Sequence, residues 1–137
     1  MATAIQRAAP SNLKNDTSVP ISAIAAFIAE ASAAVERLVP GVLAIPFGHI
    51  GDGNIHFNLS RPPDMAPACF VERWPDLVAA VEAVALALGG SVSAEHGIGR
   101  AKREALRHAR SETELEMMRA LKRALDPHGL MNPGKLL

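Results

Sequence analysis

Cysteine and aromatic residues are scarce in this chain of 137 residues, which contains one cysteine, one tryptophan, four phenylalanines and no tyrosine. Cys69 alone cannot close an intramolecular disulfide, and the chain has no cysteine cluster that could bind a metal through thiolates. We therefore expect a reducing, cytoplasmic setting. Because aromatic residues make up only 4% of the chain, small aliphatic side chains must build the core.

Net charge and long apolar runs are absent as well. The 14 lysines and arginines balance 14 aspartates and glutamates, so the chain has no overall field that would attract nucleic acid or an acidic membrane. No apolar run approaches the roughly 20 residues that span a bilayer, and the N-terminal residues lack the apolar core of a signal peptide. Apolar residues make up 49% of the chain, which excludes disorder throughout. These features predict a soluble single domain with no nucleic-acid partner and no transmembrane segment.

Periodic segments between the glycines and prolines predict an α+β fold. Residues 1–12 have no period and are expected to form a flexible arm, which leaves 13–137 as the domain. Strands are expected at 13–19, 42–47, 54–59 and 91–94, and helices at 21–38, 77–88, 100–109 and 111–125. The order of the first six elements is typical of a ferredoxin-like βαββαβ half-domain, with an antiparallel sheet covered by helices on one face and two further helices at the C-terminus. The opposite sheet face would be free for a ligand or another domain.

Two histidines flank the turn between the second and third predicted strands. Alternation over 54–59 places three polar residues on one face: Asn54, His56 and Asn58. If Asp52 and Gly53 are the two residues of a tight turn, His49 lies directly opposite His56, with the Cβ atoms about 4.5 to 5.5 Å apart. One cation could then bind both imidazoles. The plainer interpretation is two exposed histidines beside a surface turn, and a bulge would shift the register.

Glu95 is the best candidate for a third metal ligand. It follows the predicted strand 91–94, which could join the same sheet, and it precedes His96 in a turn flanked by glycine. Two histidines and one carboxylate leave open positions for a substrate and suit Zn, Mn or Fe. Beside a cation, His96 would be a natural general base because the pKa of imidazole lies near neutrality. Both residues can equally be solvated residues of an exposed turn.

Four ordered motifs carry a family resemblance. They are Gly-His-Ile-Gly-Asp-Gly-Asn-Ile-His at 48–56, Ser-Ala-Glu-His-Gly-Ile-Gly at 93–99, Leu-Asp-Pro at 125–127 and Asn-Pro-Gly-Lys at 132–135. This pattern resembles the C-terminal substrate domain of FAD-linked oxidases, which include D-lactate dehydrogenases, the glycolate oxidase FAD subunit and D-2-hydroxyglutarate dehydrogenase. The resemblance begins near Lys14, in the segment Lys-Asn-Asp-Thr-Ser-Val-Pro, and continues to the C-terminus.

The resemblance implies roles for single residues. Metal-dependent members bind a divalent cation at positions that match His49, His56 and Glu95, and the catalytic base matches His96. The positions that contact substrate match Asn58 and Lys14, of which the lysine pairs with the substrate carboxylate. The Asn-Pro-Gly-Lys segment returns toward the flavin in these enzymes, so Asn132 is expected near the cofactor.

The resemblance also implies a reaction. The intact enzyme would oxidise a D-2-hydroxy acid such as lactate, glycolate or 2-hydroxyglutarate to the 2-oxo acid, with hydride transfer to FAD. Nothing in this sequence corresponds to the FAD-binding domain of the family, so we expect a C-terminal fragment that needs this domain as partner and is inactive alone. Exposed strand edges are expected to favour homo-oligomers.

Two other functional classes stay open on the sequence. The first is a stand-alone metal-binding or oligomerisation module without redox activity. The second is a metal hydrolase that uses a cation-bound water, for which the chain offers ligands but no independent motif.

Overall fold

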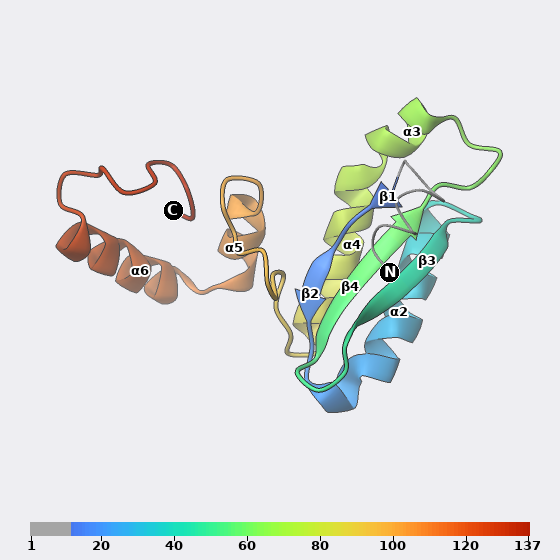
Figure 1. Cartoon of the computed structure of the whole chain (residues 1–137), viewed down its shortest axis with the longest axis horizontal. Coiled ribbons are helices and arrows are strands. Elements are labelled where there is room, and N and C mark those ends of the chain that lie inside the picture. Colours follow the sequence, from blue (N-terminus) through green and yellow to red (C-terminus); the bar gives the residue numbers. More distant parts are fainter. Residues whose placement is uncertain (1–11) are drawn as a thin grey trace. The chain divides into compact units, whose positions relative to one another are not determined.

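The computed structural model describes residues 12–137. These residues form two compact units, one that ends at Glu95 and one that begins at His96 (Figure 1). The predicted arm over 1–12 lies outside the described residues except for Asn12. We describe each unit separately.

The first unit contains a sheet and the helices that cover it. Its elements are β1 (Asn12–Leu13), β2 (Asp16–Ser18), η1 (Ile21–Ala23), α2 (Ile24–Leu38), β3 (Leu43–His49), β4 (Asn54–Ser60), α3 (Pro67–Glu72) and α4 (Trp74–Ala87). All strand pairs are antiparallel, and β4 is central, with β3 on one side and both β1 and β2 on the other. Beyond β2, a single bridge joins Ser18 to Ser91. This order confirms the predicted α+β class and the ferredoxin-like arrangement of the strands.

The prediction of a last strand at 91–94 is wrong. Ser91 exchanges two backbone hydrogen bonds with Ser18, at 2.8 and 3.1 Å, and the ladder stops there. The backbone amides of Ala94 and Glu95 donate instead to the side chain of Asp16. A buried carboxylate therefore replaces the neighbouring strand as hydrogen-bond acceptor for this segment.

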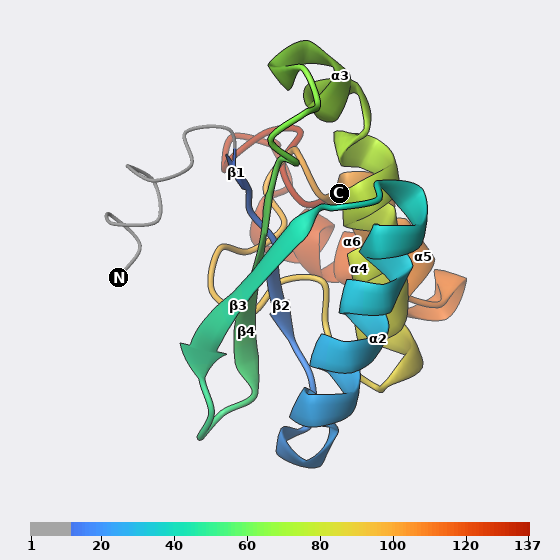
Figure 2. The ribbon, with the colours of Figure 1, turned by 90° about the vertical axis from the view of Figure 1, so that its right-hand side faces the viewer.

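The core lies on one face of the sheet. Ile55, Phe57 and Leu59 of β4 are buried on this face, and the ring of Phe57 packs edge-on against that of Phe27, with centroids 5.5 Å apart. Helices α2 and α4 contribute Phe27, Ala31, Val35, Leu77, Val81 and Ala85. Both helices lie on the same side of the sheet (Figure 2). The alternate residues of β4 therefore face the other way, as the sequence predicted.

The hairpin between β3 and β4 differs from the predicted one in its register. His49 pairs with Asn54, and Phe47, not His49, pairs with His56. The turn is longer than predicted because two backbone hydrogen bonds hold Gly53, whose φ is 76°. Its N–H donates to the carbonyl of His49, and its carbonyl accepts from the N–H of Val19. The direct opposition of His49 and His56 is thus wrong. Since the shift amounts to two residues, both histidines stay on the predicted face.

The second unit contains α5 (Arg103–Ala109) and α6 (Glu112–Leu125). The predicted capping box at the start of α6 is confirmed, with Ser111 and Glu114 each bound to the other's backbone amide. The amide of Ser111 lowers the pKa of the Glu114 carboxyl by donating to it. Helix α5 begins three residues later than the predicted start at Arg100.

Among the described residues, no helix is long and apolar enough to cross a membrane.

Candidate metal and substrate site

The carboxylate of Glu95 lies between two imidazoles on the face of the sheet opposite α2 and α4. Its Oε1 is 3.4 Å from Nδ1 of His49, and its Oε2 is 3.7 Å from Nε2 of His56. The two rings are nearly perpendicular, with centroids 6.4 Å apart. The three predicted ligands are therefore brought together, although through the glutamate and not through direct pairing of the histidines.

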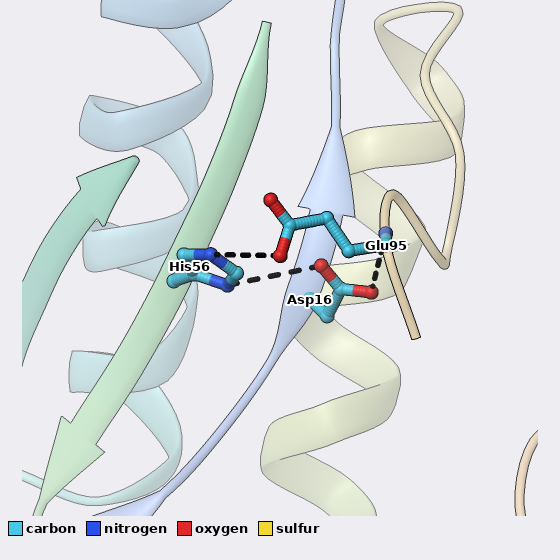
Figure 3. A group of neighbouring side chains, drawn as sticks. All are labelled: Asp16, His56 and Glu95. Atoms are coloured by element: carbon cyan, nitrogen blue, oxygen red, sulfur yellow. Dashed lines mark hydrogen bonds and ion pairs between the residues drawn. The ribbon is translucent and has the colours of Figure 1, made fainter. Parts of the chain in front are cut away.

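His56 is the most enclosed of these three residues. Its side chain is 18% exposed, compared with 60% for His49 and 43% for Glu95. The ring of Phe47 packs beside it at a centroid distance of 5.2 Å, and Asp16 flanks it from β2, with Oδ1 3.7 Å from Nδ1 (Figure 3). The two nitrogens of one ring thus face two different carboxylates.

Buried polar side chains hold the glutamate in place. Asn54, 4% exposed, donates from Nδ2 to Oε1 of Glu95 at 2.5 Å. The backbone amide of Glu95 donates to Oδ2 of Asp16 at 3.0 Å. Because both the side chain and the backbone of Glu95 are anchored, its carboxylate is directed toward the histidines.

These residues fit a divalent cation by donor type, and each glutamate–histidine pair also fits one by distance. Imidazole nitrogen and carboxylate oxygen are ligands for Zn, Mn and Fe. Two atoms that bind one zinc ion, each at about 2.0 to 2.2 Å, lie no more than about 4 Å apart. Each glutamate–histidine separation, 3.4 and 3.7 Å, satisfies that limit, through a different carboxylate oxygen in each pair. Among the described residues, the grouping whose three ligand atoms lie within 4.8 Å of one another is Asp16 with His56 and Glu95, without His49.

The two predicted substrate residues lie on the same face of the sheet as His56. Leu13 pairs with Leu59, and Asp16 pairs with His56. The offset between partners is the same in both pairs, so Lys14, between β1 and β2, falls opposite Asn58, on the face of Asp16 and His56. Lys14 is exposed and Asn58 is 5% exposed.

The two remaining predicted residues belong to the second unit. His96 directly follows Glu95 in the chain and is exposed. Asn132 is exposed in a turn near the C-terminus, where its backbone adopts a φ of 48°. Their roles as base and cofactor-binding residue stay predictions.

Asp16 is the residue of this site that the sequence analysis did not identify. It lies in the segment Lys-Asn-Asp-Thr-Ser-Val-Pro, where the family resemblance begins, but a role was predicted there only for Lys14. Its neighbours in the sequence gave no sign that it lies beside His56. The signal becomes visible only when the register of β2 with β4 is known, because this register places Asp16 opposite His56.

Comparison with known proteins identifies the family of the chain. The family model for FAD linked oxidases, C-terminal domain, matches residues 1–136. The chain belongs to this family. The resemblance inferred from the motifs is thereby confirmed.

Several curated relatives of this oxidase domain carry enzyme names. D-2-hydroxyglutarate dehydrogenases of Xanthomonas citri pv. viticola and Stutzerimonas stutzeri are 45% and 42% identical over 123 residues, which cover 90% of this chain and 26% of each relative. Glycolate oxidase subunit GlcD of Bacillus subtilis is 31% identical over 134 residues, which cover 98% of this chain and 28% of that protein. The chain therefore spans about a quarter of the length of these relatives.

Proposed function

We propose that this chain supplies the metal and substrate site of an FAD-dependent D-2-hydroxyacid dehydrogenase. In this reaction a D-2-hydroxy acid such as lactate, glycolate or 2-hydroxyglutarate is oxidised to the 2-oxo acid, and FAD receives the hydride. The observation that supports the proposal is the convergence of His49 and His56 on Glu95, on the sheet face opposite α2 and α4, in a chain of the FAD-linked oxidase family.

His49, His56 and Glu95 would hold the cation, and Zn, Mn and Fe all suit this donor set. A cation bound there would act as a Lewis acid that lowers the pKa of a substrate hydroxyl. Nearby carboxylates make the site attractive to a cation, since Asp52 lies 3.8 Å from Nδ1 of His49 and Asp16 lies 3.7 Å from Nδ1 of His56.

The chain's own residues would bind the substrate and take its proton. Lys14 is proposed to hold the substrate carboxylate through its ammonium group, and the amide of Asn58 to hydrogen-bond a substrate oxygen. His96 is proposed to take the hydroxyl proton on its imidazole as the C2 hydride leaves, so that the C–O bond becomes a carbonyl. FAD, bound mainly by a separate FAD-binding domain near Asn132, would supply the hydride acceptor.

A chimeric enzyme tests this function. The matched segment of the Xanthomonas citri relative is replaced by this chain, and oxidation of D-2-hydroxyglutarate, D-lactate and glycolate is followed with an artificial electron acceptor. We expect oxidation of at least one acid, loss of activity in chelator and recovery with Zn or Mn. The chain alone is expected to be inactive because it offers no hydride acceptor.

Two variants make the test specific. His56→Ala is expected to lower the activity of the chimera at least about 100-fold because it removes a metal ligand. His108→Ala serves as the control, since His108 is an exposed histidine of α5, and activity should be unchanged. A chimera that folds and binds FAD and a cation, yet oxidises none of the three acids, would favour a metal-binding module without redox activity.

The cellular compartment of the protein is a further part of the proposal. Cys69 is exposed and free, and a lone exposed thiol is typical of a reducing compartment. We therefore propose a cytoplasmic enzyme.

A further inference from the structure

Asp16 is a buried carboxylate at the edge of the proposed metal site. It is 3% exposed, and burial of a charge is costly unless hydrogen bonds compensate for it. Three donors converge on its Oδ2: the backbone amides of Ala94 and Glu95, at 3.1 and 3.0 Å, and Oγ of Ser93, at 3.3 Å. Asp16 thereby attaches the segment that carries Glu95 to β2, next to the central strand β4.

The other oxygen of Asp16 faces His56. Its Oδ1 lies 3.7 Å from Nδ1, while Nε2 of the same ring lies 3.7 Å from Oε2 of Glu95 (Figure 3). A neutral imidazole carries one proton, and a neighbouring carboxylate favours the ring nitrogen nearest to it as the protonated one. The two carboxylates are equally distant, but the side chain of Asp16 is 2% exposed and that of Glu95 is 43% exposed, so solvent screens the charge of Glu95 more strongly. Asp16 therefore favours a proton on Nδ1, which leaves the lone pair of Nε2 directed toward Glu95.

Asp16 can take part in a metal site in two ways. Its ligand atom lies within 4.8 Å of those of His56 and Glu95, which would allow direct binding of a shared ion. If the ion instead binds Nε2 of His56 beside Glu95, Asp16 is left beside Nδ1, on the other side of the ring. Carboxylates that accept the second N–H of a metal-binding histidine are a recurrent feature of metal sites.

We propose that Asp16 is a positioning residue that acts on two ligands at once. It sets the tautomer of His56, and it holds the backbone of Glu95, so that Nε2 and the glutamate carboxylate face the same point. The effect on metal affinity rests on the proposed function, whereas the effect on the tautomer does not.

The tautomer of His56 is measured on the metal-free full chain. Ring ¹⁵N chemical shifts separate protonated from unprotonated imidazole nitrogens, and His56→Ala assigns the signals. At about pH 8.5, where an ordinary imidazole is neutral, we expect the proton on Nδ1. Asp16→Asn should move it to Nε2, because the amide oxygen can retain the backbone donors while the amide nitrogen donates to Nδ1. A proton on Nε2 in the unmodified chain overturns the proposal without any variant.

Metal affinity gives the second readout. Competition with a chromophoric chelator should show that Asp16→Asn weakens Zn binding about 10- to 100-fold. Asp52→Asn is the matched control: it removes the same charge beside His49, but its side chain is 66% exposed, and its effect should stay below about fivefold.

The outcomes separate the two proposals. Equal losses of affinity in Asp16→Asn and Asp52→Asn contradict a positioning role, as does an unchanged tautomer in Asp16→Asn. Complete loss of binding with an unchanged tautomer would make Asp16 a ligand instead. If the unmodified chain binds no metal, the metal part of the proposed function fails, and the ¹⁵N result still decides the role of Asp16 toward His56.

Discussion

Glu95 can face two imidazoles at once because neighbouring side chains restrict both its backbone and its carboxylate. Asp16 binds the amide of Glu95, and Asn54 binds Oε1. The exposed position of Glu95, at 43%, would otherwise leave its side chain free to choose other rotamers at a small cost. At the residue scale, the site is therefore organised by buried polar groups that are not themselves proposed ligands.

His96→Gln is a prediction at this scale. A general base contributes about 10²- to 10⁴-fold to a rate, so kcat of the chimera should fall by that factor. The metal content should be unchanged, because His96 is not in the proposed ligand set. Steady-state kinetics and elemental analysis of the same samples measure both quantities.

His128→Gln is the control for that variant. His128 is exposed in the turn after α6, and its replacement should leave kcat unchanged. An unchanged kcat in His96→Gln would contradict the assignment of the base, and so would a loss of metal that parallels the loss of rate.

The predictability of these residues depended on where their partners come from. His49, His56 and Glu95 were predicted because a hairpin motif and a glycine-flanked turn stand out locally in the sequence. Asp16 was not predicted, since its partners lie 77 to 79 residues further along the chain. The bridge between Ser18 and Ser91 brings these partners beside Asp16, and the pairing of β2 with β4 adds His56.

At the element scale, the β3–β4 hairpin determines where His49 lies. Gly48 pairs with Ile55 in this hairpin, and a Cβ at Gly48 would lie 2.0 Å from the carbonyl oxygen of Asn54. The two strands therefore lie very close together just before the turn. Because Gly48 has no side chain, they can stay this close, and His49 can pair with Asn54.

Gly48→Ala tests this role of the hairpin. The added methyl group meets backbone and not a flexible side chain, so the strands must separate. We expect the free energy of unfolding to fall by about 1 to 3 kcal/mol. Urea titration followed by circular dichroism measures it.

Gly51→Ala is the matched control in the same turn. A Cβ at Gly51 would meet no atom within 4 Å, so the change should stay within about 0.5 kcal/mol. Equal effects of the two substitutions would show that the close approach at Gly48 does not limit the hairpin.

Local patterns predicted the elements better than their pairing. The capping box of Ser111 and the alternation of β4 are set by neighbouring residues, and both are confirmed. The hairpin register was wrong because the backbone of Val19, in a distant segment, binds Gly53 and stabilises a longer turn. The strand predicted at 91–94 was wrong because a side chain competes for its amides.

At the scale of the whole molecule, one sheet serves two purposes through its two faces. The face of Phe57 packs against α2 and α4 and forms the core, while the opposite face presents His56 and its neighbours. One face of the sheet thus forms the core, and the other carries the proposed metal ligands.

The metal content of the chain is the measurement that tests the central claim most directly. The full chain is loaded with Zn or Mn, freed of excess metal by gel filtration and analysed beside His49→Ala, His56→Ala, Glu95→Gln and the control His108→Ala. We predict about one ion per chain in the unmodified protein and the control, and a marked loss in each of the three ligand variants. Equal metal content in all five proteins would contradict the account.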